Sequence, residues 1–319
     1  MKYLLRFVML AVVVVVVFVI AGIIATWAPD LSVEQLKGRW ALAPSQFVVI
    51  NGLQVHVRDE GPRDDPVPLV LLHGTSASLH TWEGWVADLK GQRRVIRFDL
   101  PAFGLTGPNL QNDYTMETYV ATVEAVVNAM GIQDFVLVGN SLGGQVAWAT
   151  AAALPQRVRK LVLIDAAGYP MEPQSIPIGF RIARIPSVRR LAEVILPRGV
   201  ILSSLRNVYG DPDQVTAELV DRYYELTLRE GNRKALAYRF DQMQKVDVAK
   251  SVATIRALKV PTLILWGGKD RLIPLENGRR FAADIAGSQL LVFDDLGHVP
   301  QEEDPQRTVQ ALRKFLLKP

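Results

Sequence analysis

A serine flanked by glycines is the part of this sequence best suited to chemistry. Residues 139–143 read Gly-Asn-Ser-Leu-Gly and follow the apolar run 135–138. The run predicts a buried strand, and the small, apolar residues after it predict a helix, so Ser141 lies at the apex of a sharp turn. Only residues without bulk fit beside such a turn, which explains the two glycines. The pattern predicts a nucleophilic hydroxyl above a sheet, and its alternative is a glycine-rich connection with a solvated serine.

A serine hydroxyl is a poor nucleophile at neutral pH and needs a neighbouring base, usually histidine. The chain has four histidines, which are His56, His73, His80 and His298. His298 follows the apolar run 290–293, and a loop at that strand end can reach a serine on a neighbouring strand, so His298 is the predicted base. Its alternative is a surface loop histidine. His56 alternates with valines in an early strand and is predicted to be structural.

A carboxylate must orient the imidazole and stabilise its charged form. Asp270 ends the segment 261–270, an apolar run followed by two glycines. The chain order Ser141, Asp270, His298 is the order typical of α/β-hydrolases. Asp165, at the end of the apolar run 161–164, is a rival acid, although a strand-end aspartate satisfied by local backbone donors is the favoured reading of it. Two further aspartates are less favoured because they lie so close in sequence to His298: Asp294 and Asp295.

The loop after the apolar run 69–72 supplies a site for the oxyanion that forms during acyl transfer. Two backbone N–H groups aimed at that oxygen would lower the barrier. One is expected from Leu142, directly after the nucleophile, and the other from Thr75 in this loop. His73 precedes a glycine here and is predicted to brace the loop by hydrogen bonding rather than to act as the base. Neither a metal nor a cofactor is expected.

These segments together resemble the α/β-hydrolase superfamily, from Phe47 to the C-terminus. The resemblance rests on residues 72–74, 99–104, 138–144, 265–270 and 297–300. It implies an α/β-hydrolase fold and a Ser-Asp-His triad. One departure is Ala102, which stands where the family usually has a glycine. The chain is similar to lipases and esterases with one N-terminal anchor, including monoacylglycerol lipases, and to meta-cleavage product hydrolases. Dehalogenases and epoxide hydrolases carry an aspartate nucleophile, so Ser141 argues against both.

Short apolar runs alternate with helical patterns, which predicts a mostly parallel central sheet with helices on both faces. The expected strands are two around the turn Asn51-Gly52, then 69–72, 95–98, 135–138, 161–164, 263–266 and 290–293. The expected organisation is a membrane anchor at 1–28, a linker at 29–46, a hydrolase core at 47–168 and 252–319, and a helical cap at 169–251. The cap sequence interleaves arginines with apolar residues. It either covers the active site with its apolar face or lies in a membrane interface.

The first 28 residues are strongly apolar. Residues 7–25 carry no charge, and as a helix they would span about 28 Å, close to the roughly 30 Å of a bilayer's hydrocarbon core. A retained anchor is favoured over a cleaved signal peptide, whose apolar region is about 7–15 residues. Lys2 and Arg6 precede the span, which favours a cytoplasmic N-terminus and a catalytic domain on the outer side, periplasmic or extracytoplasmic.

Composition excludes several classes of function. The net charge of +4 is spread evenly along the 319 residues, so no nucleic-acid partner is expected. Without cysteine, disulfides and thiolate catalysis are excluded.

The leading hypothesis is a membrane-anchored serine hydrolase of lipidic carboxylic esters, with a small-molecule substrate and membrane lipids as partners. Carbon–carbon bond hydrolysis of dienoate products is the first alternative. A non-catalytic binding protein of the same fold is the second, and its mark would be a missing triad residue. The oligomeric state stays open.

Overall fold

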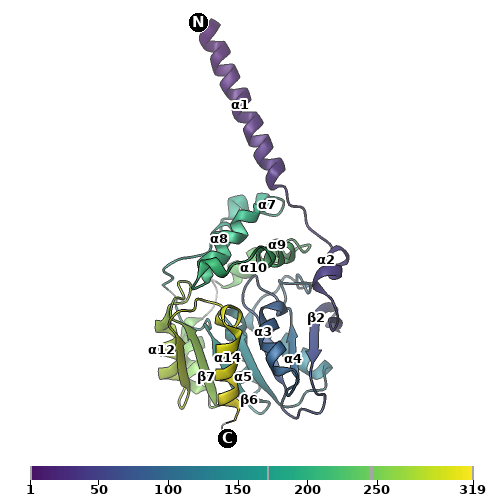
Figure 1. Cartoon of the computed structure of the whole chain (residues 1–319), viewed down its shortest axis with the longest axis vertical. Coiled ribbons are helices and arrows are strands. Elements are labelled where there is room, and N and C mark those ends of the chain that lie inside the picture. Colours follow the sequence, from purple (N-terminus) through teal and green to yellow (C-terminus); the bar gives the residue numbers. More distant parts are fainter. Residues whose placement is uncertain (1, 171, 244–246, 318–319) are drawn as a thin grey trace.

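The computed structural model describes residues 2–170, 172–243 and 247–317, which form one sheet with helices around it (Figure 1). In this part of the chain eight strands pair in the order β1-β2-β4-β3-β5-β6-β7-β8. From β4 to β8 in this order every neighbouring pair is parallel. The pairs β1–β2 and β2–β4 are antiparallel. The expected fold is therefore confirmed. The strands are β1 Gln46–Ile50, β2 Leu53–Glu60, β3 Leu69–Leu72, β4 Val95–Phe98, β5 Phe135–Asn140, β6 Val158–Ile164, β7 Thr262–Gly267 and β8 Gln289–Phe293.

Helices cover both faces of the sheet because its strands are apolar on both sides. Leu69 and Leu71 of β3 pack against α3 (Glu83–Leu89) and α14 (Pro305–Leu316). Val70 and Leu72 of the same strand belong to the core on the opposite face. That face is covered by α4 (Met116–Ala129), α5 (Leu142–Ala153), α11 (Val248–Ala257) and α12 (Leu275–Asp284). Successive side chains of a strand point to opposite faces, so each central strand serves two cores.

The chain between β6 and β7 leaves the sheet and forms a layer of helices beside the carboxyl ends of the strands (Figure 1). These helices are α6 Ile178–Ala183, α7 Arg189–Ala192, α8 Arg198–Val208, α9 Ala217–Thr227 and α10 Asn232–Met243. This layer corresponds to the cap that we propose at 169–251, although residue 251 falls inside α11. Phe180, Ile201 and Leu205 face inward, whereas Ile185 and Leu191 are exposed. The inward side chains line the cavity at the site, whereas a place for the exposed ones in a membrane interface stays a prediction.

The N-terminal helix α1 (Lys2–Thr26) projects away from the rest of the molecule (Figure 1). Residues 6–26 have a mean hydropathy of 3.4 and are not buried, so the helix is long and apolar enough to cross a membrane. A signal sequence would have the same properties. The chain after α1 is fixed to the cap, because Ala28 N donates to Val194 O at 2.9 Å and the Arg233 guanidinium lies 2.6 Å from an Asp30 carboxylate oxygen.

The proposed linker at 29–46 is packed rather than extended. It contains α2 (Val33–Trp40), which begins at Ser32 with a capping box closed by Gln35. Leu36 and Trp40 are buried in a small cluster with Leu226 of α9. The linker therefore joins the helix α1 to the cap as well as to the sheet.

Candidate active site

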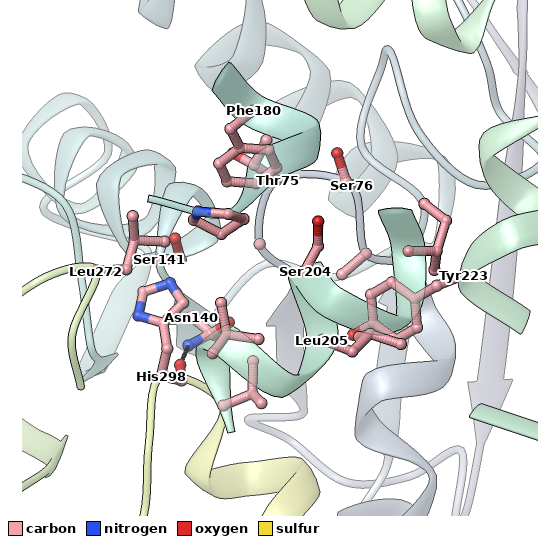
Figure 2. A pocket seen from close by; sticks show the side chains of 16 residues that line it. Thr75, Ser76, Asn140, Ser141, Phe180, Ser204, Leu205, Tyr223, Leu272 and His298 are labelled. Carbon is pink, nitrogen blue, oxygen red and sulfur yellow. Dashed lines mark hydrogen bonds between the residues drawn. The ribbon is translucent and has the colours of Figure 1, made fainter. Parts of the chain in front are cut away.

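Ser141 occupies the tight turn between β5 and α5 and has a positive φ of 55°. A residue other than glycine is strained in this region of the backbone map. A Cβ atom at Gly139 would lie 2.1 Å from Gly143 O, and one at Gly143 would lie 2.2 Å from Leu72 O. Both glycines are therefore required by close backbone approach, as the sequence predicts. The turn places the Ser141 side chain in a cavity that His298 also lines (Figure 2).

His298 forms a short hydrogen bond with Asp270, with 2.6 Å between Nδ1 and Oδ2. Both side chains are buried. The other oxygen of Asp270 accepts the backbone N–H groups of Leu272 and Ile273, at 2.8 and 2.9 Å. Since Nδ1 is engaged by Asp270, Nε2 is the ring nitrogen left for a proton from Ser141.

No hydrogen bond joins the rival acids to His298 among the described residues. Asp165 is fully buried after β6, and its Oδ1 accepts the N–H of Gly267 at 3.0 Å. Burial and the nearby charge of Asp270 raise the pKa of the Asp165 carboxyl well above its ordinary value. Asp294 and Asp295 are exposed, and Asp295 pairs with Arg307 at 2.7 Å. Of the four aspartates considered, Asp270 is the one that bonds to His298.

The loop after β3 lies against Ser141. A Cβ atom at Gly74 would lie 3.1 Å from the Cβ of Ser141, and Thr75 lines the same cavity as the serine. Leu142 is the first residue of α5, so its N–H is one of the free donors of a helix N-terminus. The structure thus brings Thr75 and Ser141 to one cavity, with Leu142 directly after the serine.

His73 braces this loop, as the sequence predicts. Its Nδ1 lies 2.7 Å from Gly74 O, and its Nε2 accepts the N–H of Leu100 at 2.9 Å. Burial lowers the pKa of His73, which is consistent with a neutral ring that donates at one nitrogen and accepts at the other. The neighbouring turn contains Ala102, where the superfamily usually has glycine, with a φ of 84°. Alanine therefore occupies a left-handed position that glycine would adopt without strain.

The His298 loop is held in place by two residues outside the predicted site, Asn140 and Glu303. The Asn140 amide donates to His298 O at 3.0 Å. Glu303 accepts the N–H of Gly297 at 2.9 Å and that of Gly210 in the cap at 2.7 Å. Burial raises the pKa of the Glu303 carboxyl. Asn140 stood within the quoted turn motif, whereas no local sequence signal marks Glu303, because its partners lie up to 93 positions away.

The cavity at Ser141 is small and mainly apolar, with a volume of about 70 Å³. Phe180 of α6 and Leu205 of α8 are among its walls, and the polar groups Ser204 and Tyr223 also come from the cap (Figure 2). No lysine or arginine is among the described residues that line it. A second cavity of about 110 Å³ lies within the cap and shares Ser76, Phe180 and Ile201 with the first. The two cavities therefore share part of their walls, and the second is also lined by Arg233.

Residues 67–305 match the α/β hydrolase fold family, and the chain belongs to this family. The 2-hydroxymuconate semialdehyde hydrolase of Pseudomonas sp. (strain CF600) is 31% identical over 277 residues, which cover 84% of this chain and 92% of that protein. The solved meta-cleavage product hydrolase from Pseudomonas fluorescens IP01 is 26% identical, with a TM-score of 0.74, and the match covers 85% of this chain and 97% of that one.

A solved membrane phospholipase A is also similar, at 26% identity and a TM-score of 0.74. The match covers 99% of this chain and 97% of that one, and so extends over the N-terminal helix. The chain is thus a hydrolase of the α/β fold, and the predicted resemblance to both meta-cleavage product hydrolases and lipases is confirmed. The relatives differ in the substrates that their names give.

Proposed function

We propose that this protein is a membrane-anchored serine hydrolase that cleaves carboxylic esters with an apolar acyl chain. The observation that carries this proposal is the cavity at Ser141, which is mainly apolar and has no described lysine or arginine in its walls. An acyl chain is compatible with such walls, whereas an anionic substrate would lose its hydration without gaining a cation. The similar membrane phospholipase A supports a lipidic ester.

Ser141, His298 and Asp270 act together in this proposal. The Ser141 hydroxyl attacks the ester carbonyl while Nε2 of His298 takes its proton. The N–H groups of Thr75 and Leu142 stabilise the oxyanion. The alcohol leaves with the proton from His298, and an acyl-enzyme remains. Water then attacks the acyl-enzyme with His298 again as base, which releases the acid and restores Ser141. Asp270 orients the ring and stabilises its charged form.

The apolar helix α1 is proposed to be a retained anchor with a cytoplasmic N-terminus. Its length supports a spanning helix, and the basic residues Lys2 and Arg6 before the apolar span support this orientation. The catalytic domain would then act on the outer side and meet amphiphilic substrates at the bilayer.

Carbon–carbon bond hydrolysis of dienoate products is the second candidate. The named sequence relatives favour it, since a 2-hydroxymuconate semialdehyde hydrolase is 31% identical. A dienoate carries a carboxylate, however, and the walls of the Ser141 cavity offer it no described cation.

One experiment separates the two candidates. The full-length protein in detergent is assayed with p-nitrophenyl esters of graded acyl chain length and, in parallel, with 2-hydroxymuconate semialdehyde. We expect ester turnover that improves with chain length and no turnover of the dienoate. Turnover of the dienoate with a much higher kcat/KM than any ester would transfer the assignment to the second candidate.

A further inference from the structure

A second buried carboxyl group lies behind Asp270. Asp165 is fully buried after β6 and adopts a positive φ of 44°. One side-chain oxygen of Asp165, one of Asp270 and a ring nitrogen of His298 all lie within 4.8 Å of one another. Among the described residues, no N–H or O–H group donates to Asp165 Oδ2. Two carboxyl groups thus share a dry site beside the proposed base.

The two carboxyl groups have unequal sets of partners. Asp270 receives two backbone N–H groups at one oxygen and His298 at the other. Asp165 receives one, from Gly267. Two like charges this close in a buried site are strongly unfavourable, and hydrogen bonds from donors decide which group keeps its charge. Asp270 is therefore the carboxylate, and Asp165 is the group that holds a proton.

Burial and two acidic neighbours act on Asp165 in the same direction. Burial has the largest effect on the pKa of Asp165 and raises it, and the charge of Asp270 raises it further. Glu303, which is packed on the His298 loop, raises it as well. A proton on Asp165 can only be donated toward an acceptor, and the neighbouring acceptor is the Asp270 carboxylate.

We propose that Asp165 is a protonated positioning residue whose O–H donates a hydrogen bond to Asp270 and holds that carboxylate toward His298. The inference rests on the proposed function, because it assigns a role within the same catalytic unit. Asp165 touches no substrate, and no bond to it forms or breaks during turnover. Its effect is to fix the orientation of Asp270 and to limit how strongly Asp270 stabilises the imidazolium ion.

The test compares Asp165→Asn with Asp165→Ala in the full-length protein. An asparagine amide can donate an N–H where the carboxyl donates an O–H, and its oxygen can still accept from Gly267. We expect kcat and the pH profile of Asp165→Asn to stay within a few-fold of the unmodified protein. Alanine removes the donor, and kcat is expected to fall about 10–100-fold, as is typical when the partner of a site residue is lost. KM should change little.

The pH profile separates positioning from general structural damage. Without the hydrogen bond, Asp270 carries a fuller charge and favours the imidazolium form of His298. The acidic limb of the kcat/KM profile should therefore move to higher pH in Asp165→Ala and not in Asp165→Asn. Asp295→Asn is the matched control, since Asp295 is an exposed carboxylate on the same loop as His298 and pairs with Arg307. Its profile should not move.

Infrared spectroscopy tests the proton directly and needs no alanine variant. The unmodified protein at neutral pH should show the C=O stretch of a protonated carboxyl group that is missing in Asp165→Asn. A missing band, an Asp165→Asn variant as impaired as Asp165→Ala, or a folded Asp165→Ala with unchanged kcat and profile would each overturn the inference. Loss of the proposed function itself would appear separately, as esterase activity that persists in Ser141→Ala.

Discussion

Two Ser–His–Asp relays occur in the part of the chain that the structure describes, and their comparison shows what a catalytic site requires beyond three side chains. In the first, Asp270 holds His298 beside Ser141. In the second, His56 Nδ1 lies 2.8 Å from an oxygen of Asp99, and His56 Nε2 lies 2.8 Å from Ser45 Oγ. By distance alone the second relay is the more complete, since among the described residues no hydrogen bond joins Ser141 to His298, whereas both contacts of the second relay are short. Hydrogen bonds of a catalytic relay are often loose in the absence of substrate.

The surroundings of the two serines differ more than the relays do. Ser141 lies on a strained turn and lines a cavity beside the Gly74 loop. The Ser45 hydroxyl instead accepts the Nε–H of Arg58 at 2.8 Å while it contacts His56. Its oxygen is therefore engaged on two sides. A nucleophile needs space for the substrate and N–H groups for the oxyanion; the surroundings of Ser141 offer the space, and Thr75 and Leu142 are proposed to supply the N–H groups.

The second relay braces the first. Asp99 accepts the N–H groups of Leu79 and Leu105, at 2.7 and 2.8 Å, in addition to His56. It thereby fixes the turn that begins at Leu100, whose N–H in turn holds His73 and the loop of Thr75. The structural relay supports the loop that is proposed to bind the oxyanion.

The largest expected effect is on the serines. Ser141→Ala should lose on the order of 10⁶-fold in kcat, the size seen when a serine nucleophile is removed from a triad, and should no longer react with a fluorophosphonate. Ser45→Ala should keep both properties, because its hydroxyl is committed to Arg58 and His56. Ester turnover and fluorophosphonate labelling on a gel are measured for both variants. Labelling that persists in Ser141→Ala would reverse the assignment of the two relays.

The histidines should separate catalysis from stability. His298→Ala should be nearly as inactive as Ser141→Ala, and the double variant no worse, since the residues act as a unit. His56→Ala should keep its turnover per folded molecule and lose roughly 1–3 kcal/mol of unfolding free energy, because Asp99 loses a buried hydrogen-bond partner. Urea titration and active-site titration together check this. Equal losses of activity in the two variants would contradict the distinction.

The two buried aspartates should affect stability in opposite directions at neutral pH. His56, by its charge and its hydrogen bond, lowers the pKa of Asp99 despite burial. Asp99 therefore adds stability above its unfolded pKa of about 3.9, and this is lost as pH falls through the lower folded value. The pKa of Asp165 is raised in the folded protein. Asp165 therefore lowers the free energy of unfolding increasingly as pH rises above its unfolded pKa of about 3.9. Asp165→Asn should raise Tm more at pH 7 than at pH 4, whereas Asp99→Asn should lower Tm most at neutral pH.

The smallest expected effect concerns α1. A protein that starts at Asp30 should keep its kcat on short soluble esters, since every residue of both relays lies later in the chain. It should lose activity toward long-chain esters in vesicles, and the full-length protein should stay in the membrane after a carbonate wash. A soluble full-length product shortened near Ala28 would instead identify a signal peptide, and the comparison of the two relays would be unaffected.

Local patterns predicted much of this structure. The turn Asn51-Gly52 predicted the hairpin, and both residues have a positive φ. The glycines around Ser141 predicted its tight turn, and chain order predicted the neighbourhood of Asp270 and His298. Glu303 and the contact between Asp165 and Asp270 could not be predicted, because they depend on how distant elements pack. The contacts of His56 with Asp99 and Ser45 could not be predicted for the same reason, although the sequence indicates a structural role for His56.

The attachment of α1 to the cap has a mechanical consequence. Trp27 pairs with Ile195, and Asp30 is tied to Arg233 on α10, while the N–H of His298 donates to Val208 O at the end of α8. The cap is therefore attached both to the chain at the end of α1 and to His298, the proposed base, and forms a path between them. If α1 spans a bilayer, its tilt acts as a lever on this path, and a thicker or thinner membrane would change the aperture above the serine without any ligand.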